Sequence, residues 1–247
     1  PHQPADRIRR GLSRFSRVAG VSRRVLFIYN DPTAPEAMLG EAFAQRGFDI
    51  DTCTGTAELP DPLNYDVVVP LGSRFAVHDP ANAAWVEPEM ALVRHAVAAG
   101  VGVLGVCFGG QLVARALGGT VDRSPAPELG WYAVDSQVPF ISAGPWFQWH
   151  SDRWTLPAGA VEIARNDNAS QAFISGSALA LQFHPELDAP LLELWLAEDS
   201  DGDAARLGVD IDELRTRTGA EHDAAADRLG TLVTGFLTHV GTGSVAR

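Results

Sequence analysis

The sequence contains no lysine, so its 19 basic residues are all arginine, and they are outnumbered by 31 acidic residues. The resulting net charge of −12 at pH 7 argues against nucleic acid as a partner, because a phosphate backbone is bound by basic surfaces. We attribute the missing lysine to codon usage and not to chemistry.

Cysteine is scarce as well, with only Cys53 and Cys107 in 247 residues. Two cysteines do not suggest a disulfide framework, and they fit a reducing, cytoplasmic location. No run of about eighteen apolar residues and no apolar leader before a small-residue cleavage site is present, so neither a membrane span nor a secretion signal is predicted. We also expect no metal site and no cofactor, since five histidines lack acidic or cysteine partners at ligand spacing: His2, His78, His95, His222 and His239.

Basic residues are concentrated at the start of the chain. Seven arginines stand there among few acids: Arg7, Arg9, Arg10, Arg14, Arg17, Arg23 and Arg24. Residues 1–23 are therefore predicted to be a basic N-terminal arm, and residues 24–247 a single domain, because a chain of this length and apolar content can bury one core. The arm is either a solvated segment lying on the acidic body or a docking arm for an acidic partner.

The body of the chain alternates apolar, strand-like runs with helical segments. The expected strands cover 25–29, 48–52, 67–69 and 102–106, and the expected helices cover 35–45 and 87–99. This alternation predicts an α/β fold with an open parallel sheet and helices on both faces. In such a sheet, ligands bind at the carboxyl ends of the strands, which is where the pattern places Gly72 and Cys107.

The second half of the chain has a different pattern. Short, turn-bounded segments that favour β structure occur at 119–121, 131–134, 146–149, 161–164 and 171–174. They predict a small antiparallel flap beside the main sheet. From residue 190 the pattern is helical, with an acidic loop at 198–203 and helices at 211–217 and 222–239. This helical C-terminal extension, beginning at about residue 197, could cover the site or bind a synthetase, but we expect it to pack against the sheet.

Cys107 follows an apolar strand, 101–104, and precedes a helix that begins near Phe108. A sharp strand-to-helix turn exposes its central residue at the sheet edge, and small neighbours let the backbone approach there: Gly105, Gly109 and Gly110. The first N–H groups of the helix favour a thiolate and supply donors for an oxyanion. This context predicts that Cys107 is a nucleophile.

A nucleophilic cysteine needs a base, and a second motif supplies one. The short apolar strand 179–183 ends in His184, with Glu186 two residues further on. If His184 takes the thiol proton and Glu186 orients the imidazole, the three side chains form a Cys-His-Glu relay suited to acyl transfer.

The two motifs together resemble the class I, or triad, glutamine amidotransferases. Their signatures are a G-[IVL]-C-[FLY]-G-x-Q elbow, read here at 105–111, and an F-H-P-E segment, read at 183–186. The resemblance runs from about Arg24 to about Leu196 and implies a flavodoxin-like fold. It also implies that Cys107 attacks the side-chain amide of glutamine, that ammonia leaves with a proton from His184, and that water resolves the thioester.

The resemblance further implies an oxyanion hole made of two backbone N–H groups. One is that of Phe108, directly after the nucleophile, and the other belongs to a glycine after an earlier strand, which Gly72 matches. In the family this loop commonly reads Gly-Gly-Pro, whereas here Leu71 and Ser73 replace the first glycine and the proline.

Further residues resemble the family's glutamine pocket. Gln111 lies one helical turn after Cys107, and the segment at 149–152 contains His150, Ser151 and Asp152. The resemblance implies that these residues contact the substrate, although His150 could equally be a surface histidine ahead of a turn. The segment 128–131 resembles the family's Glu-x-Gly-Trp strand entry, which we expect to be structural.

We therefore expect a stand-alone enzyme that hydrolyses glutamine to glutamate and ammonia. The sequence shows no second catalytic domain, so ammonia would pass to a separate synthetase acting in trans. One alternative is a γ-glutamyl hydrolase of the same fold, acting on a larger γ-glutamyl amide. The other is a non-catalytic regulator that keeps the fold and binds a ligand or a partner.

Overall fold

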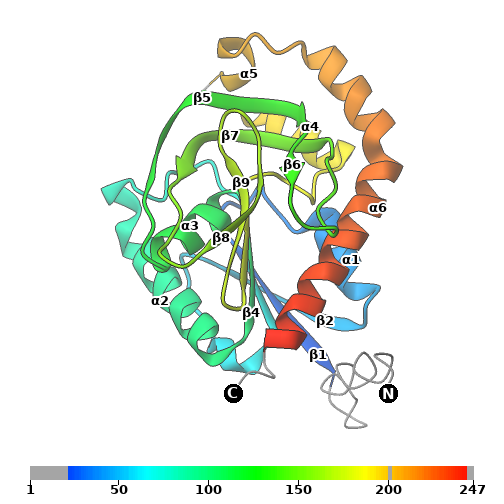
Figure 1. Ribbon diagram of the computed structural model, residues 1–247. Helices are drawn as coiled ribbons and strands as arrows, with labels where there is room; N and C mark the ends of the chain where they lie inside the picture. Colours follow the sequence, from blue (N-terminus) through cyan, green and yellow to red (C-terminus); the bar gives the residue numbers. More distant parts are fainter. Residues whose placement is uncertain (1–21, 200–201, 244–247) are drawn as a thin grey trace, which may run out of the picture.

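The computed structural model describes residues 22–199 and 202–243. Residues 1–21 of the predicted basic arm lie outside the described residues. The domain is built around one large sheet that carries helices on both faces, with a smaller sheet beside it (Figure 1).

The large sheet has the strand order β2-β1-β3-β4-β10-β9-β8-β6. Its first five strands run parallel to one another: β2 (Phe48–Thr54), β1 (Arg23–Tyr29), β3 (Val67–Pro70), β4 (Gly102–Val106) and β10 (Ala178–Leu181). Every residue of β3, β4 and β10 is buried, as expected for strands covered on both faces. The predicted parallel sheet is confirmed.

The helices divide into two layers. On one face, α2 (Ala83–Ala99) and α3 (Phe108–Ala116) share an apolar cluster with Val103 of β4 and Ala180 of β10. On the other face, α1 (Ala37–Ala44) packs against alternate strand residues such as Phe27 and Leu104. Two short 3-10 helices, η3 (Pro62–Asn64) and η4 (Pro80–Asn82), lie in the connections. Helices on both faces were predicted and are present.

The antiparallel part differs from the prediction of a single flap. Only β5 (Val121–Tyr132) and β7 (Trp146–Trp154) form the separate sheet, whereas β8 (Val161–Arg165) and β9 (Ser170–Ser175) extend the large sheet, with β6 (Asp135–Ser136) at its edge. The segments 161–164 and 171–174 were therefore wrongly assigned to the flap. β9 joins β10 through a tight turn containing Gly176, with φ 59°, and its apolar residues Ala172 and Phe173 continue the core.

Three helices follow β10: α4 (Ala189–Ala197), α5 (Asp203–Arg206) and α6 (Ile211–Gly243). The extension predicted from about residue 197 begins at the end of α4, and from here on the term C-terminal extension includes α4 as well. The sequence predicted two helices, at 211–217 and 222–239, but α6 is one continuous helix. It continues through the intervening residues because an interior glycine costs only about 1 kcal/mol and α6 carries a long stripe of buried residues. That stripe consists of Leu214, Ala225, Leu229, Leu232, Val233 and Phe236. The helix packs along α1 and α4 and reaches β4 (Figure 1). Within residues 22–199 and 202–243, none of the helices has the length and apolar character needed to span a bilayer.

Candidate active site

Cys107 occupies the turn between β4 and α3 in a strained conformation. Its φ of 51° and ψ of −108° are unfavourable for any residue with a Cβ, at a cost of about 1–3 kcal/mol. Its backbone N–H donates to Leu181 O at 2.8 Å, which fixes the bend against β10. The side chain is 5% exposed. The strain lies at the residue predicted to be the nucleophile.

The three glycines around Cys107 are explained by close backbone contacts. A Cβ on Gly109 would lie 2.0 Å from Pro70 O, and one on Gly110 would lie 2.5 Å from Leu181 O. A Cβ on Gly105 would lie 2.5 Å from Gly109 O. Because no side chain fits at these positions, glycine is what lets α3 begin directly on the ends of β3 and β10.

His184 and Glu186 are held beside the elbow by neighbouring elements. The His184 N–H donates to Phe147 O of β7 at 2.8 Å, and the Met38 N–H of α1 donates to Glu186 O at 3.3 Å. Between the two side chains, His184 Nδ1 lies 2.7 Å from Glu186 Oε1. The Glu186 residue is only 1% exposed, so its carboxylate is well placed to fix the ring orientation.

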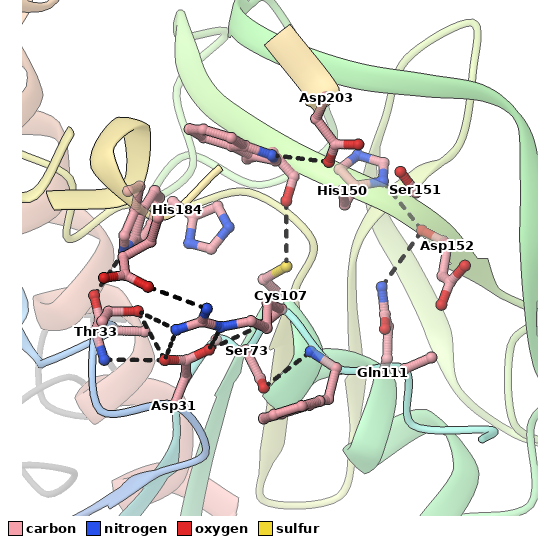
Figure 2. Close-up of a pocket in the computed structure, with 18 of the residues that line it drawn as sticks. Asp31, Thr33, Ser73, Cys107, Gln111, His150, Ser151, Asp152, His184 and Asp203 are labelled. Atoms are coloured by element: carbon pink, nitrogen blue, oxygen red, sulfur yellow. Dashed lines mark hydrogen bonds and ion pairs between the residues drawn. The ribbon is translucent and has the colours of Figure 1, made fainter. Parts of the chain in front are cut away.

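The structure brings Cys107, His184 and Glu186 together at the carboxyl edge of the sheet. Cys107 and His184 line one pocket (Figure 2), and a Cβ on Gly72 would lie 3.0 Å from His184 Cε1 and 3.9 Å from Cys107 Cβ. Burial lowers the pKa of His184, but negative charge on Cys107 and Glu186 outweighs it and raises that pKa above its usual value. These two neighbours therefore favour the charged, imidazolium form of His184.

The two candidate oxyanion donors lie on either side of this site. Gly72 follows β3, and Phe108 is the first residue of α3, where helix geometry leaves the N–H unpaired. Within the described residues, neither N–H has a hydrogen-bond acceptor. Leu71, which replaces a glycine, needs no left-handed conformation, and its side chain is fully buried in the core.

The predicted substrate-binding residues also line the pocket: Gln111, His150, Ser151 and Asp152. Gln111 Nε2 lies 3.3 Å from both Asp152 O and Gln182 Oε1. Gln182 Nε2 in turn lies 3.8 Å from Cys107 Sγ. Figure 2 shows Gln111 and Asp152 on the side of the pocket opposite His184. The sequence did not single out Gln182, although it directly precedes the F-H-P-E motif.

His150 is not a surface histidine, because only 5% of it is exposed. Its Nε2 lies 3.1 Å from Glu128 Oε2, and its Nδ1 lies 3.0 Å from Asp152 O. Glu128 also accepts from Asn166 and Gln171. The carboxylate of the predicted structural segment at 128–131 therefore anchors His150 within a buried polar network.

A second group of pocket residues was missed by the sequence reasoning. Asp31, just after β1, accepts from Arg74 Nε at 2.7 Å, and Arg74 reaches Glu198 at 3.3 Å. Burial raises the pKa of Asp31, but hydrogen bonds from Arg74 and Thr33 outweigh it and lower that pKa to about 2. The position of Asp31 at a carboxyl strand end is the signal that could have identified it.

The C-terminal extension forms one wall of the pocket. The centroids of the Trp195 and His184 rings lie 4.7 Å apart, in an edge-to-face arrangement. Trp195 Nε1 donates to Thr33 O at 2.8 Å. Trp149 Nε1 donates to Asp203 of α5 at 3.1 Å. No sequence motif marks Trp195 or Asp203, because this wall depends on how the extension folds back.

Among residues 22–199 and 202–243, no three His, Cys, Asp or Glu side chains are grouped in a way that could hold a metal ion. An open α/β sheet with a strained cysteine on a strand-to-helix turn, facing a buried histidine–carboxylate pair, defines the cysteine-elbow class of α/β proteins.

Comparison with known proteins narrows this class. Residues 41–191, more than half of the chain, match the family "Glutamine amidotransferase class-I", so the chain belongs to this family. The resemblance inferred from the two motifs is thus confirmed.

The relatives include proteins of very different length. The chain is 34% identical over 142 residues to a glutamine-hydrolyzing GMP synthase of Thermosynechococcus vestitus, a match that covers 53% of the chain and 25% of that enzyme. It is 27% identical over 155 residues to the glutamine amidotransferase-like protein chry6 of Gibberella zeae, covering 58% of the chain and 62% of that protein. The chain thus spans less than two thirds of these relatives.

Solved structures share the fold over almost the whole domain. A glutamine amidotransferase from Thermotoga maritima superimposes with a TM-score of 0.79 and 25% sequence identity, and the match covers 88% of this chain and 99% of that one. The flavodoxin-like α/β fold predicted from the sequence is confirmed.

Proposed function

We propose that this protein hydrolyses the side-chain amide of glutamine to glutamate and ammonia through a thioester on Cys107. The observation that carries the proposal is the strained, buried Cys107 lying beside the His184 imidazole, whose Nδ1 is 2.7 Å from a buried carboxylate oxygen of Glu186. Nucleophile, base and orienting group are the parts that acyl transfer requires.

In the first half-reaction the Cys107 thiolate attacks the amide carbon of the substrate. The carbonyl oxygen becomes an oxyanion and accepts hydrogen bonds from the N–H groups of Gly72 and Phe108, which have no other acceptor within the described residues. The C–N bond then breaks, and the imidazolium of His184 gives its proton to the departing nitrogen. Ammonia leaves, and the γ-glutamyl group stays on sulfur.

In the second half-reaction, neutral His184 takes a proton from a water molecule that attacks the thioester. The tetrahedral intermediate uses the same two backbone donors. When it collapses, the C–S bond breaks and Cys107 leaves as the thiolate, which restores the thiolate–imidazolium pair and releases glutamate. Glu186 orients His184 in both halves and stabilises its charged form.

The substrate is placed by the residues opposite His184. Gln111 Nε2 is committed to Asp152 O and Gln182, which leaves the Gln111 side-chain oxygen for the substrate's amide. The segment containing Ser151 and Asp152 faces the rest of the glutamine, with Arg123 close to Asp152 at 3.4 Å. We assign His150 to holding this segment in place and not to direct proton transfer.

The ammonia would serve a synthetase. Relatives named as glutamine-hydrolyzing GMP synthases match this chain over about a quarter of their length or less, so in them the shared segment accompanies much additional protein. We propose that a synthetase partner receives the ammonia formed here. Glutamine-dependent and ammonia-dependent synthesis by a candidate partner, compared with and without this protein, tests that step.

The main experiment is labelling with a chloroketone analogue of glutamine, combined with an assay of glutamate and ammonia release. Wild-type protein should be alkylated at one site, and Cys107→Ser should show neither labelling nor turnover. Cys53→Ser is the matched control and should label like the wild type. Burial raises the pKa of the Cys53 thiol to about 11, so this thiol is a poor nucleophile in the wild type.

The same assay separates the alternatives. Rapid cleavage of larger γ-glutamyl amides, with glutamine ignored even when candidate synthetases are present, would make the protein a γ-glutamyl hydrolase. Folded protein that neither labels nor turns over either substrate would be a non-catalytic regulator.

A further inference from the structure

Asn30, directly after β1, contacts the residues on both sides of Gly72. Its Nδ2 donates to Leu71 O at 3.2 Å, and its backbone oxygen accepts from Ser73 Oγ at 3.0 Å. Asn30 is 7% exposed, so these bonds are shielded from water. Leu71 and Ser73 are the two residues that depart from the family's Gly-Gly-Pro loop, and Asn30 holds both.

The bond to Leu71 determines where the neighbouring donor points. The carbonyl of Leu71 and the N–H of Gly72 belong to one trans peptide unit, whose planarity directs the two groups in opposite directions. The carbonyl points at Asn30, so the N–H points away from it. A Cβ on Gly72 would lie 3.0 Å from His184 Cε1 and 3.9 Å from Cys107 Cβ, so the residue that carries this donor borders the reacting centre.

Asn30 is itself held by Glu89 of α2. Its Nδ2 also donates to Glu89 Oε1 at 3.1 Å, and Glu89 is 0% exposed. Two atoms of this pair, Asn30 Oδ1 and Glu89 Oε2, lack a hydrogen-bond partner among residues 22–199 and 202–243. A Cβ on Gly55 would lie 2.4 Å from the first and 3.2 Å from the second, so both border the same small space.

A protonated Glu89 satisfies both of these atoms. Burial raises the pKa of Glu89 to about 8, against the opposing effect of its bond with Asn30. The carboxylic acid O–H can then donate to Asn30 Oδ1 while Nδ2 donates back, a cyclic acid–amide pair with no unpaired polar atom. Such a pair fixes the orientation of the Asn30 amide and leaves its second N–H for Leu71 O.

We propose that Asn30, held by Glu89, is a positioning residue that directs the Gly72 N–H toward the oxyanion formed at Cys107. This proposal rests on the hydrolytic function proposed above. It assigns a role to a buried carboxylate that the reaction itself does not use, and it explains how the loop presents its donor without the usual glycine and proline.

The test compares two probes of Cys107 in wild type and Asn30→Ala. A glutamine analogue with an aldehyde in place of the amide forms a tetrahedral adduct that needs the oxyanion hole, whereas iodoacetamide alkylates sulfur without it. In Asn30→Ala we expect kcat and aldehyde affinity both to fall on the order of a hundredfold, with KM and the iodoacetamide rate within about twofold of wild type.

Glu89 provides a graded comparison. Glu89→Gln can still exchange two hydrogen bonds with Asn30 and should lose much less aldehyde affinity than Glu89→Leu. Leu92→Ala is the matched control: it lies one turn further along α2, in the cluster with Ile28 and Val68, and should lower stability while leaving kcat and aldehyde affinity as in the wild type.

The outcomes separate this proposal from the function on which it rests. Wild-type aldehyde affinity in folded Asn30→Ala, or an equal loss for Leu92→Ala, would overturn the positioning role alone. If wild-type protein forms no aldehyde adduct, the thioester mechanism and the positioning role are both wrong. Should Asn30→Ala not fold, Ser73→Ala removes the second contact with Asn30, together with the bond that Ser73 Oγ accepts from the Phe75 N–H. This variant must still lower aldehyde affinity more than the iodoacetamide rate.

Discussion

Two buried histidines line the pocket, and each is paired with a buried carboxylate, but the two pairs differ in what they leave free. In the pair His184–Glu186, one ring nitrogen bonds the carboxylate and the other side of the ring faces the cysteine. In the pair His150–Glu128, both ring nitrogens are occupied, by Glu128 and by Asp152 O. The carboxylates differ in the same way: Glu128 accepts from Asn166 and Gln171 as well, whereas Glu186 Oε2 has no hydrogen-bond partner in the part of the chain that the structure describes.

We therefore propose that reactivity in this pocket depends on an unfilled hydrogen-bonding position and not on residue type. A histidine whose two nitrogens are both bonded holds structure, and one with a free nitrogen beside sulfur can move a proton. Four substitutions test this distinction.

The largest effect is expected for His184→Ala. Removal of the base and acid should lower kcat on the order of a thousandfold or more, measured as glutamate release under saturating glutamine. Circular dichroism should show a folded protein. A loss of only a few fold would mean that His184 does not transfer the proton.

Glu186→Ala should lower kcat less, on the order of a hundredfold. The carboxylate orients the ring and stabilises its charge but transfers no proton. The comparison with His184→Ala under identical conditions is the measurement, and equal losses in the two variants would contradict the assigned roles.

His150→Ala should act mainly on stability. Loss of its bond leaves Glu128 with fewer donors, which should lower the free energy of unfolding by about 2–3 kcal/mol, measured by urea denaturation. We expect kcat to fall by less than about tenfold. A thousandfold loss of kcat in stable protein would put His150, and not only His184, in the proton transfer.

Glu89 is a buried carboxylate with no imidazole partner, so its effect on stability should depend on pH. Below pH about 4.5 it is protonated in both the folded and the unfolded chain, and it adds no pH dependence to the free energy of unfolding. As the pH rises toward 8, only the unfolded chain releases the proton, so the free energy of unfolding falls. Glu89→Gln should remove this dependence and stabilise the protein at pH 7, on the order of 2 kcal/mol. Urea denaturation at pH 5 and 8 measures it, and parallel curves for both proteins would contradict the raised pKa.

The sequence predicted those parts of the structure that are fixed by local rules. The glycines around Cys107 are required because neighbouring backbone atoms leave no room for a Cβ. The strands β3 and β4 are apolar because both of their faces are buried. These features restrict which residue types are possible, so the sequence could predict the elbow, the parallel strands and the position of His184 after a strand.

Features that depend on packing between distant segments could not be predicted from the sequence. Whether β9 belongs to the flap or to the large sheet depends on its pairing with β10, and strand propensity does not specify the partner. The continuity of α6 through Gly219 depends on the core that its buried stripe meets. Trp195 and Asp203 enter the pocket only because the extension folds back over it, and no local pattern records that path.

That returning extension forms a part of the pocket that the matched family segment does not include. The segment ends at residue 191, so Cys107, His184 and Glu186 lie inside it, whereas Trp195, Glu198 and Asp203, which border the same pocket, lie beyond it. The likeness to the Thermotoga maritima structure covers 88% of this chain, so it continues past residue 191 and the extension is not peculiar to this chain. Substitutions at these three positions would reshape the pocket wall without altering the proposed nucleophile, base or orienting carboxylate.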